Sequence, residues 1–221
     1  MTIDTHEMLV VHRIFRREFG LMPRLVTDVR DGDRARAARV AEHVHDVMNG
    51  LHHHHTGEDE LLWPKLLQRV ELEAELVRRM EAQHEVVAEQ IERAHELTRR
   101  WVQRADAVTR DELATVLTRL NVALMEHLHD EEELVLPLVA EHITQAEWDA
   151  LGERGRAGIP KGRKGLLFLG ATLEDATEDE RRAMLGSMPL AARVTWRLVG
   201  RRYYDRQTAS LRRGVEAPAL V

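Results

Sequence analysis

Two stretches of the sequence share one pattern: residues 51–64 read LHHHHTGEDELLWP, and residues 124–137 read LMEHLHDEEELVLP. Each contains a histidine, a glutamate four residues later and a proline six residues after the glutamate. Residues four apart lie on one face of an α-helix, so each histidine and its glutamate can reach a common point. The matched residues are His54, Glu58 and Pro64 in the first stretch and His127, Glu131 and Pro137 in the second.

Another histidine precedes each stretch at nearly the same distance. His12 lies 42 residues before His54, and His84 lies 43 residues before His127. The chain therefore resembles two helical hairpins of similar design, each with a histidine on its first helix and a His-x3-Glu pair on its second. Packed together, four such helices can bring all six side chains to one place.

These polar residues interrupt stripes of apolar residues that repeat with helical periodicity. In a protein core, an unpaired imidazole or carboxylate costs on the order of several kcal/mol, and metal coordination removes that cost. The stripes are Met8, His12, Phe15, Phe19 and Met22; Val77, Met80, His84, Val87 and Ile91; and Leu120, Leu124, His127, Glu131, Leu134 and Leu138. We therefore predict a metal site with the ligands His12, His54, Glu58, His84, His127 and Glu131.

Two further histidine–acid pairs have the same spacing. His129 and Glu133 lack an apolar stripe around them, which argues against that pair. His55 and Asp59 are disfavoured mainly by the alignment of Pro64 with Pro137, because apolar residues would also accompany His55. Four residues are expected to lie beside the ligands: His55, Asp59, His129 and Glu132. His52 and His53 are expected to face away.

A ferritin-like carboxylate bundle is the main structural alternative. Such bundles carry Glu-x2-His motifs on two separate helices. Here Glu81-x2-His84 and Glu92-x2-His95 fall on the same expected helix, so they cannot face each other across a bundle. This alternative is disfavoured.

The periodicity predicts an all-α fold: an antiparallel four-helix bundle with a C-terminal helical extension. The expected bundle helices span about 5–28, 33–70, 73–104 and 110–142, with a short helix at 145–151. Further helices are expected at 166–173, 178–187 and 190–213. Capping boxes are expected at Asp4/Glu7, Thr109/Glu112, Thr144/Glu147 and Thr177/Glu180.

Three parts are expected along the chain: a metal-binding bundle at 1–151, a glycine-rich linker at 152–165 and a basic helical extension at 166–221. Residues 181–213 contain nine arginines and one acid, so they carry +8, and the net charge of −6 leaves −14 for the rest. The extension is interpreted as a helix packed on the bundle or as a contact in a homo-oligomer. The alternative is an amphipathic basic helix that binds anionic lipid or nucleic acid.

The composition excludes several kinds of site. The 221 residues contain no cysteine, which rules out disulfides, thiolate metal ligands and cysteine nucleophiles. The chain has no apolar run near 20 residues and no signal-peptide pattern at its N-terminus, so we expect a cytoplasmic protein. A metal must be held by histidine and carboxylate, ligands that suit iron, zinc or manganese.

The combined motifs resemble the hemerythrin-like (HHE cation-binding) family over roughly residues 5–142. The resemblance implies a non-haem di-iron centre inside a four-helix bundle, with an oxo or hydroxo bridge. His12 and His54 would bind one iron, His84 and His127 the other, and Glu58 and Glu131 would bridge them. Oxygen-carrying hemerythrins have a second histidine one turn along the third helix, where this sequence has Ala88. The chain therefore resembles the variant branch with four histidines and two glutamates.

This resemblance implies a function with O2, NO or peroxide as the small ligand. The leading interpretation is ligand binding or turnover in oxidative or nitrosative stress or in O2-dependent redox chemistry, as in a catalase-like, peroxidase-like or O2-activating oxidoreductase. A sensor or carrier of O2, NO or iron without turnover is the alternative. A structural bundle that holds zinc is a weaker one, and zinc or manganese are the expected substitutes for iron.

Overall fold

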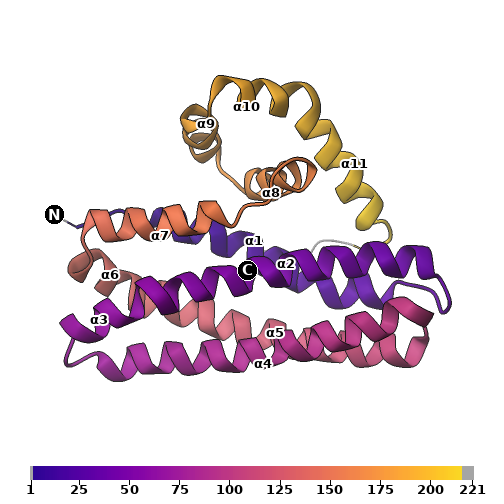
Figure 1. The fold of residues 1–221 in the computed structure, drawn as a ribbon, viewed down its shortest axis with the longest axis horizontal. Coiled ribbons are helices and arrows are strands. Elements are labelled where there is room, and N and C mark those ends of the chain that lie inside the picture. The colour runs from indigo at the N-terminus through magenta and orange to yellow at the C-terminus, as the bar shows by residue number, and fades with distance from the viewer. Residues whose placement is uncertain (1, 216–221) are drawn as a thin grey trace. The chain divides into compact units, whose positions relative to one another are not determined.

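The computed structural model describes residues 2–215, and every regular element in that range is a helix (Figure 1). These residues form two compact units: one extends to Gly158, and the other begins at Ile159. Among the described residues, each helix is either too short or too polar to cross a lipid bilayer. The all-α prediction is confirmed.

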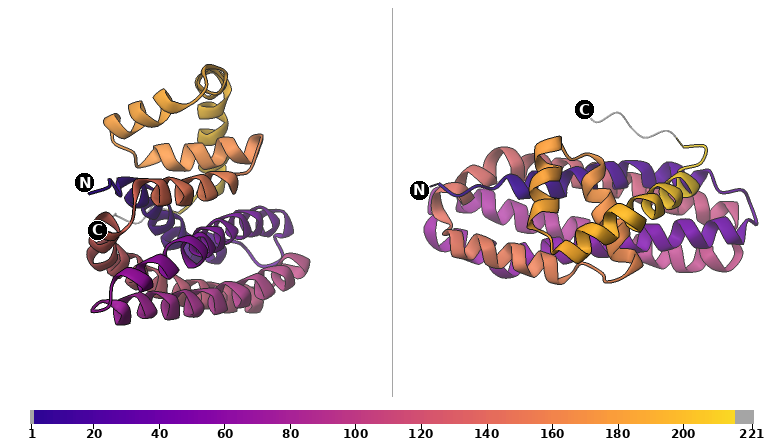
Figure 2. Two further views of the ribbon diagram at one scale, coloured as in Figure 1. Left: turned by 60° about the vertical axis from the view of Figure 1, so that its left-hand side comes forward. Right: turned by 90° about the horizontal axis from the view of Figure 1, so that it is seen from above.

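Four long helices form an antiparallel bundle in the first unit (Figure 2). Each helix packs against two neighbours, in the cyclic order α1, α2, α4, α5. The helices are joined by short connections, and Ala105 leaves α4 in a left-handed conformation with φ of 54°. Their bounds are α1 (His6–Thr27), α2 (Arg34–Leu61), α4 (Ala74–Arg104) and α5 (Ala107–Asp130).

Helix α5 begins three residues earlier than the sequence pattern predicts. The Asp106 side chain accepts a hydrogen bond from the Thr109 backbone N–H, so Asp106 caps the helix. The predicted Thr109/Glu112 box is therefore wrong, and so is the Asp4/Glu7 box, because Thr5 precedes α1 without a side-chain cap. The boxes at Thr144/Glu147 and Thr177/Glu180 are confirmed.

Regular α-helical geometry is interrupted just after the glutamate of each His-x3-Glu pair. Helix α2 ends at Leu61, and α3 (Trp63–Arg69) begins with Pro64 in its first turn. Helix α5 continues into the π-helical turn η1 (Glu131–Val135) and then α6 (Leu136–His142), with Pro137 in its first turn. A proline lacks an N–H and crowds the carbonyl four residues before it, so a continuous α-helix is disfavoured there. The helix predicted at 33–70 is therefore divided at Leu62, whereas the one predicted at 110–142 remains helical to His142 and passes through a π-helical turn.

The π-helical turn also moves the core stripe of this helix by one residue. Leu134, predicted to face inward, is 44% exposed, whereas Val135 and Val139 are fully buried. A π-helical turn closes its hydrogen bond over five residues instead of four, as between the Leu136 N–H and the Glu131 carbonyl. The extra residue rotates everything after Glu131 relative to the predicted register.

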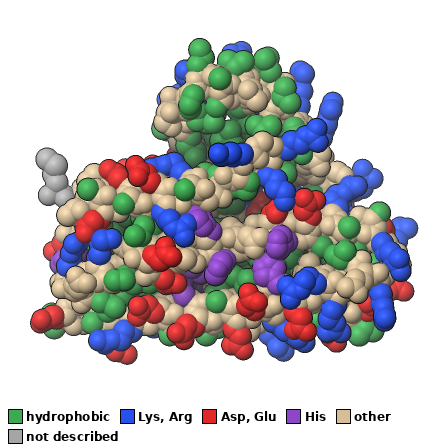
Figure 3. All heavy atoms as spheres, in the orientation of Figure 1, with side chains coloured by type: hydrophobic (Ala, Val, Ile, Leu, Met, Phe, Trp, Pro, Cys, Tyr) green, Lys and Arg blue, Asp and Glu red, His purple; other side chains and the backbone are tan. Residues whose placement is uncertain are grey.

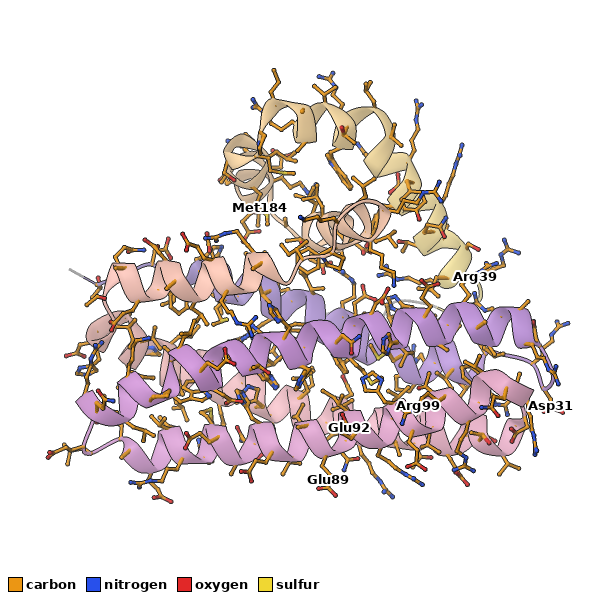
Figure 4. All side chains as sticks on the ribbon, viewed as in Figure 1. Asp31, Arg39, Glu89, Glu92, Arg99 and Met184 are labelled. Carbon is orange, nitrogen blue, oxygen red and sulfur yellow. The ribbon has the colours of Figure 1, made fainter. Side chains whose placement is uncertain are left out.

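Apolar side chains fill the bundle on both sides of the level of His12. On one side, the core includes Trp63 and Met80 and extends to Trp148 of α7 (Gln145–Ala157). On the other side, Phe19, Leu51 and Trp101 are fully buried. The outer faces are charged, and Glu89 on α4 points away from the bundle (Figure 4).

Helix α7 runs to Ala157, so the first half of the predicted linker at 152–165 is helical. It packs against α2, where Gly57 lies close to Leu151. Arginines and alanines between the glycines support this continuation, because a few glycines weaken a helix without ending it. The predicted end at residue 151 is therefore wrong.

The second unit is a separate group of helices. Glu174 holds it together, because its carboxylate accepts hydrogen bonds from the Tyr204 hydroxyl and from the Arg212 guanidinium. Tyr204 also packs so closely on Gly170 that a side chain at that glycine would collide with the ring. The elements are α8 (Arg163–Glu174), α9 (Glu178–Ser187), α10 (Leu190–Thr195), η2 (Trp196–Gly200) and α11 (Arg201–Leu211).

Candidate metal centre

All six predicted ligands converge in the interior of the bundle. They come from all four long helices and from the π-helical turn, and all but His54 are buried. Other histidines lie at the surface of the same unit, where they gather on the α2 side (Figure 3). The converging residues are His12 on α1, His54 and Glu58 on α2, His84 on α4, His127 on α5 and Glu131 on η1.

The four imidazoles form two pairs. The Nε2 atoms of His12 and His54 are 3.3 Å apart, and those of His84 and His127 are 3.2 Å apart. Two nitrogen ligands on one metal ion at about 2.0–2.1 Å each would be separated by a similar distance. Each hairpin therefore supplies one pair.

The two glutamates connect these pairs. Glu58 places one carboxylate oxygen 3.2 Å from His54 Nε2 and the other 3.6 Å from His84 Nε2. The Oε2 atom of Glu131 lies 3.3 Å from His12 Nε2 and 3.6 Å from His127 Nε2. Each carboxylate thus contacts one imidazole from each of the two pairs, which is the arrangement expected of a bridging ligand.

The residues present fit a metal pair. All four carboxylate oxygens of Glu58 and Glu131 are buried, and none has a hydrogen-bond partner among the described residues. Burial and the neighbouring Glu131 raise the pKa of Glu58, while burial lowers the pKa of His54. Neutral imidazoles offer lone pairs and the carboxylates lack a counter-charge, so bound cations would satisfy both. Two donor groups share Glu58: His12, His54, Glu58 and Glu131; and His55, Glu58, His84 and His127.

Outer hydrogen bonds orient three of the imidazoles. His12 Nδ1 lies 2.8 Å from a Glu132 carboxylate oxygen, and Arg16 binds the other oxygen of that carboxylate. His84 Nδ1 lies 2.7 Å from Asp59, and His127 Nδ1 lies 3.3 Å from the Gln83 side-chain oxygen. An Nδ1–H that donates outward leaves the Nε2 lone pair facing the centre of the bundle.

The expected neighbours of the ligands divide into three cases. Asp59 and Glu132 lie beside the ligands, as predicted. His129 is exposed, so that prediction is wrong, because the side chain lies on the solvent face of α5. His55 lies deeper than predicted and belongs to one of the two donor groups. The spacing of the sequence did not indicate the role of Gln83, since no motif includes it.

The family model of the hemerythrin HHE cation-binding domain matches residues 4–139. This chain belongs to the hemerythrin HHE family. The match covers the helices of the bundle and all six converging ligands. No curated protein and no solved structure matches the chain.

The geometry also argues against the ferritin-like alternative for this hemerythrin domain. Glu92 is exposed, and His95 pairs with the exposed His45, whose Nδ1 atom lies 3.3 Å from that of His95. A second Glu-x2-His motif facing the centre is therefore missing from the described part of α4. The chain is a cation-binding hemerythrin-like bundle with a cluster of histidine and glutamate ligands.

Proposed function

We propose that this hemerythrin-like protein holds two iron ions and binds or turns over a small oxidant, namely O2, NO or H2O2. One observation carries the proposal: two imidazole pairs are joined by two buried carboxylates that find no hydrogen-bond partner within residues 2–215. Imidazole and carboxylate ligands without thiolate suit iron, zinc and manganese, and of these iron best supplies redox chemistry.

The chain would hold each ion with a small set of side chains. His12 and His54 would hold one ion, His84 and His127 would hold the other, and Glu58 and Glu131 would contribute to both. Asp59 and Glu132 fix the orientation of two imidazoles and make them stronger donors. A bound iron pair supplies two electrons, which is enough to reduce a peroxide.

The enclosure of the site limits the ligand to a small molecule. The His54 side chain is 14% exposed, whereas the other five ligand side chains are at most 5% exposed. The ring of Phe15 lies 5.3 Å from that of His54 and contributes an apolar wall at this side. Such burial favours a ligand as small as a diatomic molecule or peroxide and keeps bulk water from the carboxylates.

Anaerobic loading with ferrous iron tests the proposal. We expect two irons per chain, an optical change on adding O2, NO or peroxide, and disproportionation of peroxide to O2 and water. A lasting spectrum without peroxide turnover would instead indicate a sensor or carrier. Zinc uptake without stable iron binding would contradict the proposal. The variant His54→Gln should lose iron, and the exposed His129→Gln serves as its matched control.

A further inference from the structure

His55 occupies a place in the metal centre that its spacing in the sequence did not predict. Its side chain is buried, with 5% exposure. One of its ring nitrogens lies within 4.8 Å of donor atoms of Glu58, His84 and His127. The neighbouring His52 is exposed, and His53 turns away and contacts the Arg154 carbonyl at 3.0 Å. Of these three histidines, only His55 reaches the interior.

The ring contacts assign His55 to one side of the centre. Its imidazole stacks on that of His84 with a centroid distance of 3.9 Å and an interplanar angle of 9°. It lies 4.9 Å from the ring of His127 and 5.7 Å from that of His54. His55 therefore belongs with the His84/His127 pair and not with the His12/His54 pair.

The Nε2 atom of His55 is buried and has no hydrogen-bond partner among the described residues. Leaving such a nitrogen unsatisfied destabilises the folded chain. In a neutral imidazole one ring nitrogen carries a lone pair that a metal ion can bind. A metal ion at this position would satisfy that nitrogen.

Helix geometry explains how α2 can serve both ions. Adjacent residues on an α-helix point about 100° apart, so His54 and His55 address different directions. Glu58 lies four residues after His54 and three after His55, and both spacings place it on the neighbouring surface. Its carboxylate lies between the two histidine pairs, as its contacts with His54 and His84 show.

We propose that His55 is a metal ligand, the third imidazole on the ion held by His84 and His127. This inference rests on the proposed metal pair and gives the two ions unequal environments. Helix α2 thus adds His55 to the donor side chains of Glu58, His84 and His127, which come from three helices. The ion held by His12 and His54 would have one imidazole fewer, and His54 is the ligand side chain that reaches the surface.

Stepwise metal titration of the full-length chain tests His55, with Fe²⁺ under anaerobic conditions and separately with Zn²⁺. The variant His55→Phe keeps a ring for stacking on His84 and removes the nitrogen. His55→Gln removes the ring, and His52→Gln is the matched control in the same histidine row. Circular dichroism confirms that each variant is folded. We expect both His55 variants to weaken one of the two binding steps at least tenfold, while His52→Gln changes neither step.

Mössbauer spectra of the iron-loaded proteins provide a second measurement. Wild type should show two unequal iron sites, and His55→Gln should alter one of them. If His55→Phe binds both metals as tightly as wild type, the role of His55 is stacking and the inference is overturned. If iron does not bind but His55→Phe still weakens zinc binding, the ligand role stands and the proposed iron function fails.

Discussion

Glu58 is the residue on which both halves of the metal centre depend. It belongs to both donor groups, and its carboxylate oxygens face His54 on one side and His84 on the other. Burial and the neighbouring Glu131 both disfavour the charged form of this carboxylate, and they therefore raise its pKa. The Glu58 side chain would thus link the binding of one proposed metal ion to the binding of the other.

Replacing Glu58 by Gln should therefore affect both ions and not one. We expect metal content to fall from two ions per chain to less than one, because a neutral amide cannot bridge two cations. The metal-free variant should be at least as stable as the metal-free wild type, since a buried charge has been removed. Metal analysis and chemical unfolding check both statements, and retention of two tightly bound ions would contradict the bridging role.

The outer carboxylates should have smaller effects. Asp59→Asn and Glu132→Gln keep the shape of the side chains that contact His84 and His12 but weaken the hydrogen bonds to their Nδ1 atoms. We expect metal affinity to fall about 10–100-fold in each variant. Competition with a chelator measures the change. An equal loss in the exposed control Glu133→Gln would show that local charge and not orientation is responsible.

The convergence of the six residues could be predicted because a four-residue spacing is a local property of a helix, and their role as ligands stays a prediction. Spacing did not indicate how far His55 reaches into the interior, because four consecutive histidines point in four directions around α2. Which of these directions faces the interior depends on how α2 packs against α4, and spacing alone does not contain that information.

At the scale of elements, the π-helical turn and the α2/α3 break show why the buried positions of a helix can differ from those that a regular 3.6-residue period predicts. Pro64 and Pro137 lie at the same distance after the two glutamates. Their consequences differ, because α2 ends at Leu61 whereas α5 absorbs one extra residue in η1. The Leu134 prediction failed for that reason. Predicting it would have required the hydrogen-bond pattern around Glu131.

Glu147 links three elements outside the metal centre. Its side chain completes the capping box of α7, and it forms a two-point ion pair with Arg69 of α3, at 2.7 and 2.8 Å. Arg69 also donates to the carbonyl of His142 at the end of α6. The hydrogen bonds from Arg69 hold the pKa of Glu147 well below its usual range, with those from Thr144 adding to the effect.

Replacing Glu147 by Gln should lower the free energy of unfolding at pH 7 by about 1–2 kcal/mol. Because the folded-state pKa lies below that of the unfolded chain, the stabilisation is present above the ordinary glutamate range and is lost as the pH falls below it. The difference from wild type should therefore shrink below about pH 4. Urea unfolding of the metal-free proteins at pH 7 and pH 3 measures this, with Glu153→Gln as control. A difference that does not depend on pH would refute the ionic explanation.

At the scale of the whole molecule, the metal centre and its supporting core lie within the first compact unit. The second unit carries its own contacts around Glu174 and leaves apolar Leu190 and Leu198 exposed among arginines. The sequence predicted a separate basic extension from charge and glycine content. Composition alone could not place its start, because the glycines of α7 are tolerated within a helix.

A chain that ends at Pro160 should fold and bind metal like the full-length protein. All the proposed ligands and the core around them lie before that residue, so the same two ions should bind with affinities within about threefold. Circular dichroism and metal titration test this expectation. Loss of helicity or of metal binding in the shortened chain would show that the second unit is needed for the bundle.

The distribution of the imidazole pairs also sets an order of events during synthesis. His12 and His54 both belong to the α1–α2 hairpin, and His84 and His127 both belong to the α4–α5 hairpin. Both imidazoles of the first pair are therefore synthesised before either imidazole of the second pair. Glu58, Glu131 and His55 each contact an imidazole of the other hairpin, within the larger packing of the two hairpins. The two imidazole pairs therefore come together only once the second hairpin has docked on the first.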